Sequence, residues 1–316
     1  MNIKKYYGRN PIIDYLFRKL IWLDLCSHVR KKAPMNKIYV VQRKDKAGFF
    51  SIFFYTIGHL MLAEKYGCKA LVDWQSYPTP YNEPYEIFNT RNAWEYFFNQ
   101  PSSGKIEEIN FAEACCSEEK YPYGIVPHYS WTNLGSEGVP TRAMVTRIND
   151  FLKRNSILKR EIIESFETEA AELNLSECLG VHIRGTDMKI AAGHNHPIGL
   201  EENMKIIART LHEQKLKKIF LCTDEENTVE RAREIFGDAL LCSSAYRASR
   251  ASNIGIHLET EDDGIRENHH YLLGREVFRD AYLLSKCRAL VCGKSNVAYA
   301  AIVFNNNQFE KILYTN

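Results

Sequence analysis

The second half of the chain alternates between short apolar runs and longer amphipathic segments, and this alternation restricts the fold more than any other feature. Strands that alternate with helices form parallel sheets, because each helix carries the chain back to the same edge. The sequence therefore predicts an α/β fold with a doubly wound parallel sheet. The expected strands are 178–184, 217–223, 238–244, 289–293 and 311–315, and the expected helices are 199–214, 225–236, 270–286 and one from 295.

The first half predicts a second α/β unit. A strand over 37–42, a largely buried helix that follows Gly48 and ends near Gly67, and a strand over 69–75 form one βαβ unit. Residues 76–145 are rich in Tyr, Pro and Gly and predict long surface loops, and residues 142–173 have a helical pattern. The length of 316 residues suggests about two domains. We place them at 1–165 and 166–316.

Positive charge is concentrated at the N-terminal end. Residues 1–46 contain twelve Lys or Arg and three Asp, although the whole chain has a net charge of only +2. A general nucleic-acid binder is therefore not expected. The basic segment can be an amphipathic helix packed on its domain, or it can lie on an anionic membrane surface. It is too short and too charged to span a bilayer, and it lacks the apolar core of a signal peptide.

The nine cysteines are an odd number and include no C-x-x-C pair. This pattern predicts reduced thiols in a cytoplasmic protein and does not fit a zinc site.

The first candidate site segment is GVHIRGTDMK, residues 180–189. In an extended strand His182 and Arg184 share a face and leave the sheet together at its end, where Gly185 lets the backbone turn. The Arg184 guanidinium matches phosphate oxygens. Alternatively, Arg184 pairs with Asp187 or with a helix carboxylate.

Two further segments follow strands of the same predicted sheet. In LCTDEEN the Asp224 carboxylate can accept two N–H bonds from a purine edge, or it can cap the following helix. In VCGKSNVAYAAIVF a helix start with Lys294, Ser295 and Asn296 offers donors to an anion, or Ser295 is simply the helix cap.

Together these segments predict a nucleoside diphosphate ligand, because the carboxyl ends of parallel strands meet at one edge of the sheet. Neither a P-loop nor a G-x-G-x-x-G fingerprint is present, which argues against an ordinary dinucleotide dehydrogenase.

The same segments resemble a known family. GVHIRGTDMK resembles the H-x-R-R-T-D motif of the α1,6-fucosyltransferase and NodZ group, distant kin of protein O-fucosyltransferases. IFLCTDEEN and LLSKCRALVCGKSNVAYAA resemble later segments of that family in the same order, and AGFF to KALVDW resembles its N-terminal loop, helix and strand. The resemblance covers about 178–304 well and 36–75 faintly.

The resemblance implies a GT-B enzyme with two Rossmann-like domains facing a cleft. The C-terminal domain would bind a GDP-sugar, first choice GDP-fucose, and the N-terminal domain would shape the site of a glycan acceptor. By position, Arg184 would contact the β-phosphate and His182 and Asp224 the guanine, with Ser295 a further phosphate ligand. The resemblance implies that the reaction needs neither a metal nor a cofactor. It also implies a role in surface glycan synthesis, at the cytoplasmic side of a membrane.

The sequence also departs from the family. Gly185 replaces the second arginine of the motif, and the acidic candidate base of the family falls near Ala191. Asp187, His194 and Glu201 are the candidate bases here, and His196 lies in the same loop as His194. The alternatives are a transferase with a UDP- or CMP-sugar donor and a non-catalytic relative that binds nucleotide or glycan.

Aromatic residues of the first half can stack on sugar rings or anchor their own loops. They are Trp74, Tyr77, Tyr81, Tyr85 and Trp131.

Overall fold

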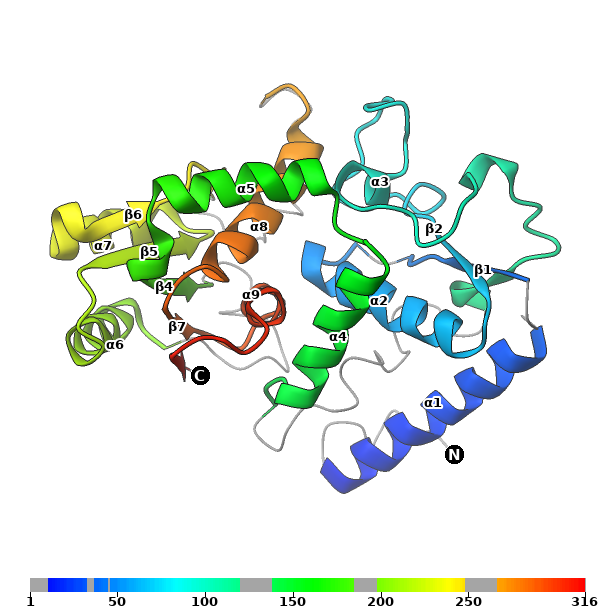
Figure 1. The fold of residues 1–316 in the computed structure, drawn as a ribbon, viewed down its shortest axis with the longest axis horizontal. Helices are drawn as coiled ribbons and strands as arrows, with labels where there is room; N and C mark the ends of the chain where they lie inside the picture. The colour runs from blue at the N-terminus through cyan, green and yellow to red at the C-terminus, as the bar shows by residue number, and fades with distance from the viewer. Residues whose placement is uncertain are drawn as a thin grey trace. The chain divides into compact units, whose positions relative to one another are not determined.

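The computed structural model describes residues 11–32, 37–44, 46–119, 138–184, 198–247 and 266–315. The chain forms two compact units, Met1–Lys159 and Arg160–Asn316 (Figure 1). The boundary that we place at 165/166 falls inside a helix, α5 (Arg160–Glu172), which lies wholly in the second unit.

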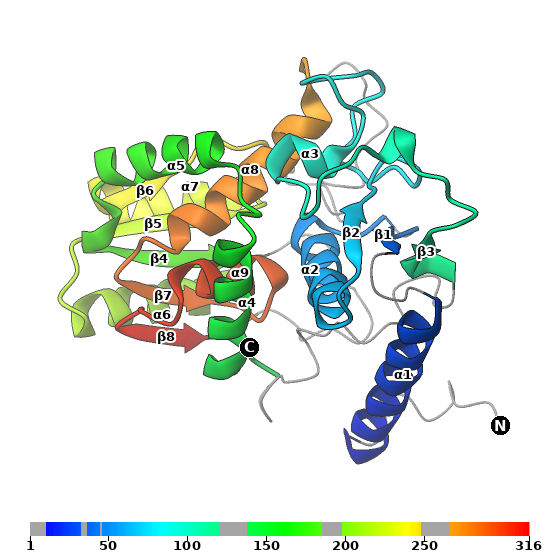
Figure 2. The same ribbon diagram turned by 45° about the vertical axis from the view of Figure 1, so that its right-hand side comes forward.

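A five-stranded sheet forms the centre of the second unit, and all of its neighbouring strands pair in parallel (Figure 2). Its order is β6-β5-β4-β7-β8, so the chain winds outward from β4 to one side and then from β7 to the other. Each strand lies within one or two residues of its predicted position, and the predicted doubly wound sheet is confirmed. The strands are β4 (Cys178–Ile183), β5 (Lys218–Thr223), β6 (Leu240–Cys242), β7 (Ala289–Cys292) and β8 (Lys311–Tyr314).

Two groups of helices pack on this sheet. In one group α6 packs against α7, and in the other α8 lies beside both α5 and α9 (Figures 1 and 2). The further bounds are α6 (Leu200–Glu213), α7 (Glu226–Phe236), α8 (His269–Leu284) and α9 (Asn296–Asn305).

The central strand β4 divides its side chains between these two groups. Leu179, Val181 and Ile183 belong to a buried core that includes residues of α6 and α7. A Cβ atom added to Gly180, on the other face, would lie 3.0 Å from the Cys287 Cβ, just after α8. Strand alternation places His182 on the same face as Gly180.

The first unit contains a parallel sheet of order β2-β1-β3, which confirms its α/β class. The helix α2 (Phe49–Lys65) is almost wholly buried. Residues 142–173 form two helices, α4 (Arg142–Arg154) and α5, because the chain turns at Ser156, which has a left-handed φ of 48°. The strands are β1 (Ile38–Val41), β2 (Lys69–Val72) and β3 (Cys115–Cys116).

The described parts of the segment from 76 to 145, which are 76–119 and 138–145, contain more regular structure than the predicted surface loops. They include α3 (Ala93–Phe97) and β3, and their aromatic residues join a cluster around α2. The short length of α3 and β3 explains why no periodic pattern marks them in the sequence.

The basic N-terminal segment contains α1 (Pro11–Lys32). Leu25 and Val29 are buried, whereas Leu20 and Leu23 are 65% and 56% exposed. Within the described part of the chain, no helix has the length and apolar character that crossing a membrane requires. All nine cysteines are free thiols.

Candidate functional site

The winding direction of the second sheet reverses between β4 and β7, which pair with His182 opposite Cys292. A crevice forms at such a reversal, beyond the carboxyl ends of the strands, and it is where open α/β sheets bind ligands. Arg184 follows β4 directly, and Lys294 and Ser295 follow β7. The topology therefore brings two of the three predicted segments to the switch point itself.

A side-chain contact joins the two strands at this point. The His182 Nδ1 lies 3.3 Å from the Ser295 Oγ, and both residues are buried. Ser295 is also the N-cap of α9, since its Oγ accepts the Ala298 N–H at 3.2 Å. The interpretation of Ser295 as a helix cap is thus correct, and the same hydroxyl also contacts the His182 imidazole.

The start of α9 presents further donors. The first N–H groups of a helix have no acceptor within it, and Ser295 takes only that of Ala298. The N–H groups of Asn296 and Val297 therefore point out of the helix start, where its dipole favours an anion. The Lys294 side chain is half-buried beside them in sequence.

Burial dominates the electrostatics of His182. It lowers the pKa of the ring to about 4, while the Asp224 carboxylate raises that pKa and the Arg184 guanidinium lowers it further. The imidazole is therefore neutral at neutral pH. Because both charges act on one ring, the three predicted residues lie close together at the end of the sheet.

Asp224 is not the N-cap of the next helix. The N-cap of α7 is Glu225, whose backbone N–H donates to the Thr223 Oγ1 at 3.3 Å and whose carboxylate accepts the Thr228 hydroxyl at 3.2 Å. Asp224 precedes this arrangement and is half-buried. The helix-cap explanation of Asp224 is therefore wrong.

Of the three candidate bases, only Glu201 lies within the described residues. Asp187 and His194 lie in 185–197, outside the described residues, as do Gly185, Ala191 and His196. The Glu201 carboxylate is exposed and bound by Arg231, with its Oε1 2.8 Å from Nε and its Oε2 3.1 Å from Nη2. Arg231 lowers the pKa of Glu201, which makes this carboxylate a weaker proton acceptor.

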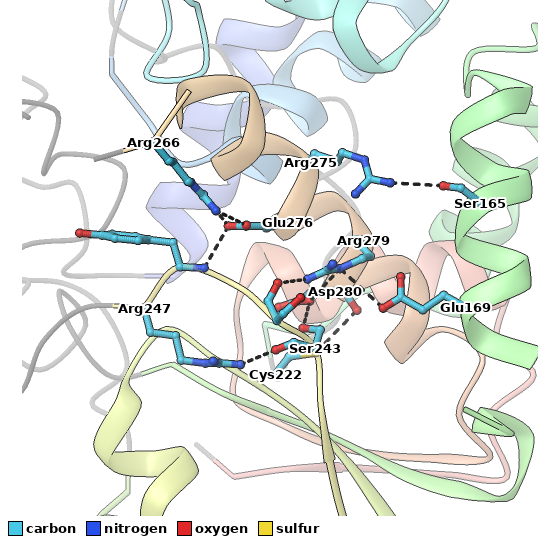
Figure 3. A network of polar contacts seen from close by, with 12 residues as sticks. Ser165, Glu169, Cys222, Ser243, Arg247, Arg266, Arg275, Glu276, Arg279 and Asp280 are labelled. Atoms are coloured by element: carbon cyan, nitrogen blue, oxygen red, sulfur yellow. Dashed lines mark hydrogen bonds and ion pairs between the residues drawn. The ribbon is translucent and has the colours of Figure 1, made fainter. Parts of the chain in front are cut away.

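A polar network lies beyond β5 and β6, built around residues that were not predicted from the sequence (Figure 3). Ser243 follows β6, and its hydroxyl donates to the Asp280 carboxylate of α8 at 2.6 Å. Burial raises the pKa of Asp280 to about 6. The Cys222 thiol of β5 faces the Asp280 carbonyl at 3.9 Å. This network fastens α8 over the ends of both strands.

Arginines complete the network. Arg266 binds both oxygens of Glu276, at 2.6 and 2.9 Å, and Arg279 donates to the Ser244 carbonyl at 2.6 Å (Figure 3). Glu276 and Asp280 are spaced four apart on α8. Such spacing places charges on one helix face, which is the signal that could have identified the network from sequence. Its groups mainly bind one another, so it positions the strand ends and does not itself suggest a ligand.

The aromatic residues of the first unit divide into two groups. Trp74 and Tyr81 are at most 2% exposed and pack against Phe49, so they are core residues and cannot stack on a sugar. Tyr77 and Tyr85 retain exposed surface. Trp131 lies outside the described residues.

Comparison with known proteins gives structural matches only. No protein-family model and no curated sequence matches the chain. The NodZ α-1,6-fucosyltransferase co-crystallised with GDP is 14% identical, with a TM-score of 0.44 over 84% of this chain and 91% of NodZ. POFUT1 in its apo form is 12% identical, with a TM-score of 0.49 over 89% of this chain and 98% of POFUT1. POFUT1 in complex with GDP-fucose is 9% identical, with a TM-score of 0.48 over 90% of this chain and 98% of POFUT1.

Proposed function

We propose that this protein is a glycosyltransferase that moves a sugar, fucose first choice, from a GDP-sugar to a carbohydrate hydroxyl with inversion. The observation that carries the proposal is the joining of His182 and Ser295 across the switch point of a doubly wound sheet. Arg184, Asp224 and the start of α9 follow β4, β5 and β7, and therefore lie at the same edge of this sheet.

Arg184 and the start of α9 would bind the diphosphate. A guanidinium and exposed helix N–H groups both match phosphate oxygens, and Lys294, Ser295 and Asn296 would add donors. Negative charge grows on the departing diphosphate in the transition state, so donors fixed in advance would stabilise that state more than the substrate.

Asp224 and His182 would bind the guanine. A carboxylate can accept both the N1–H and the N2–H of guanine, and neither uracil nor cytosine offers this pair. A neutral imidazole has one donor and one acceptor nitrogen, and burial keeps His182 in that form.

A base must deprotonate the acceptor hydroxyl as the anomeric carbon becomes positive. We assign this role to Asp187 or His194, since Arg231 binds Glu201 and lowers its pKa. The reaction would need no metal and no cofactor, because arginine and helix donors neutralise the leaving group. Turnover that persists in excess EDTA is the expected result, and its loss would contradict this part.

The proposed setting is surface glycan synthesis at the cytoplasmic face of a membrane. Leu20 and Leu23 are exposed on α1, and Arg30, Lys31 and Lys32 form its exposed basic end. Such a helix can bind an anionic surface through both apolar and ionic contacts. We expect the protein to sediment with phosphatidylglycerol vesicles but not with phosphatidylcholine vesicles. Failure to sediment with either type of vesicle would contradict the membrane contact.

Thermal-shift measurements with GDP, UDP and CMP test the donor. A ligand at 100 times its Kd stabilises the folded state by about 2.7 kcal/mol, so GDP is expected to raise the melting temperature clearly. Loss of one charge-assisted contact in Arg184→Ala is expected to weaken GDP about 10- to 100-fold. Arg209→Ala is a matched control, because Arg209 is an exposed residue of α6 that pairs only loosely with Glu213, at 3.9 Å.

Stabilisation by UDP or CMP and not by GDP would overturn the assignment of guanine to Asp224. Stabilisation by none of the three would overturn the transferase proposal. Release of GDP from GDP-fucose, measured with and without a panel of glycans, then distinguishes a transferase from a relative that only binds.

A further inference from the structure

A groove of about 930 Å³ lies between α2 and α4 and belongs wholly to the first unit (Figure 1). The last two turns of α2 form one side of it, through Met61, Glu64 and Lys65. One face of α4 forms the other side, from Arg142 in its first turn to Arg154 in its last. The described lining shares no residue with the candidate GDP site, so the groove requires an explanation of its own.

The described lining of the groove has an excess of two positive charges. It contains four cationic side chains and two carboxylates, namely Lys65, Arg142, Arg147, Arg154, Glu64 and Asp150. Glu64 is already neutralised, because the Arg154 Nη2 lies 2.9 and 2.8 Å from its two carboxylate oxygens. The groove therefore favours an anionic ligand, and this attraction depends on the total charge of the lining rather than on any one donor.

Arg147 indicates that the acidic groups of the protein do not fully compensate this charge. Burial lowers the pKa of Arg147, although the Glu64 carboxylate raises it. A lowered pKa means that the surroundings of the guanidinium disfavour its positive charge. An anion in the groove would act in the opposite direction and stabilise that charge.

The start of α4 adds to the preference for an anion. Arg142 is the first residue of this helix, and the first turn contains no acidic side chain. A helix start favours negative charge, so an arginine there is unfavourable for the helix alone. Arg142 and Ala143 both line the groove, where an anion would interact favourably with the arginine and with the helix dipole.

The groove meets the basic end of α1 at Tyr66. The Lys65 Nζ lies 5.3 Å from the centroid of the Tyr66 ring. Burial and a hydrogen bond to Cys26 of α1 raise the pKa of Tyr66 to about 12, and the charge of Arg30, also in α1, lowers it. The cations of the groove are thus continuous with the exposed basic end of the helix whose two exposed leucines suit a membrane surface.

We propose that this groove binds the phosphate headgroup of an anionic phospholipid while α1 lies on the membrane surface. Its volume suits a small molecule such as a glycerol phosphate headgroup and is larger than a single phosphate ion needs. Continuity with α1 favours a lipid over an acidic peptide. The inference rests on the proposed function in one respect, the membrane setting, and it names the lipid class and the site that would recognise it.

Sedimentation with phosphatidylglycerol vesicles tests the groove in Arg142→Gln and Lys65→Gln, each of which removes one exposed charge. Loss of one charge-assisted contact is expected to weaken vesicle binding about tenfold or more. Lys153→Gln is the matched control, because Lys153 is an exposed cation of α4 that does not line the groove. Its vesicle binding is expected to change by less than about threefold. An equal effect of all three substitutions would overturn the inference.

Dihexanoylphosphatidylglycerol below its micelle concentration tests the groove without a membrane. Phosphorus NMR is expected to show binding to the wild type and to Lys153→Gln, and weaker binding to Arg142→Gln and Lys65→Gln. Absence of binding to the wild type would overturn the inference. Inorganic phosphate that binds as tightly as the lipid would identify a site for free anions, and a decaglutamate peptide that binds more tightly would identify a protein-docking site. Either result would overturn the lipid assignment.

Two comparisons separate this inference from the proposed function. If the wild type binds the soluble lipid through the groove but does not sediment with vesicles, the membrane setting fails and the headgroup site stands. If vesicle binding is the same in the wild type and in both groove variants, the headgroup site fails alone. All of these variants are expected to keep the wild-type thermal shift with GDP, so a failure of GDP to bind concerns only the transferase proposal.

Discussion

His182→Gln should change how the stability of the protein depends on pH. The folded chain holds the ring with a pKa of about 4, against 6.5 for the exposed ring of the unfolded chain. The unfolded state therefore binds an extra proton between these values. Stability from a neutral buried ring is present above pH 6.5 and is lost as the pH falls toward 4. For these two pKa values the loss between pH 7 and pH 4.5 is about 2–3 kcal/mol.

Urea denaturation followed by circular dichroism at several pH values measures this difference. Glutamine does not titrate, so the variant should lose about 2–3 kcal/mol less stability than the wild type between pH 7 and pH 4.5. His212→Gln, at an exposed position of α6, is the matched control and should follow the wild-type profile. A His182→Gln profile parallel to that of the wild type would refute the reasoning, because the ring would then have similar surroundings in both states.

Two further variants test the packing around α8. Asp280→Asn should change the pH dependence of stability in the opposite direction. Burial raises the pKa of Asp280 to about 6, so the free energy of unfolding of the wild type increases by about 2 kcal/mol as the pH falls from 8 to 4.5. The variant should lack this increase when its denaturation is measured over the same pH range. A gain that persists in the variant would place its origin elsewhere. Gly180→Ala should destabilise by about 1–3 kcal/mol, since the new Cβ would lie 3.0 Å from the Cys287 Cβ. An unchanged urea midpoint would mean that α8 shifts at little cost.

Much of the second unit follows from its sequence. Its strands are apolar runs that alternate with helical segments, so local patterns place all of them except α5 within one or two residues. The edge of the sheet that carries the candidate site is predictable too, because parallel strands end on the same side. In the first unit the same reasoning misses α3 and β3, which are too short to show a period.

Local sequence also cannot separate a core residue from a binding residue. Trp74 and Tyr77 stand three positions apart in one aromatic loop, yet only Trp74 is buried among Phe49 and Trp94. Asp224 is a residue type that often caps helices, but the N-cap of α7 is the next residue, Glu225. These outcomes depend on where neighbouring elements pack, and single positions carry no record of that.

The sequence by itself determined the alternation of strands and helices and placed His182, Arg184, Asp224 and Ser295 at strand ends. The order β6-β5-β4-β7-β8, and with it the meeting of His182 and Ser295, was decided only by the tertiary structure. Local propensity acts over a few residues, whereas the pairing of β4 with β7 joins segments more than a hundred positions apart and is selected by the burial of the whole sheet.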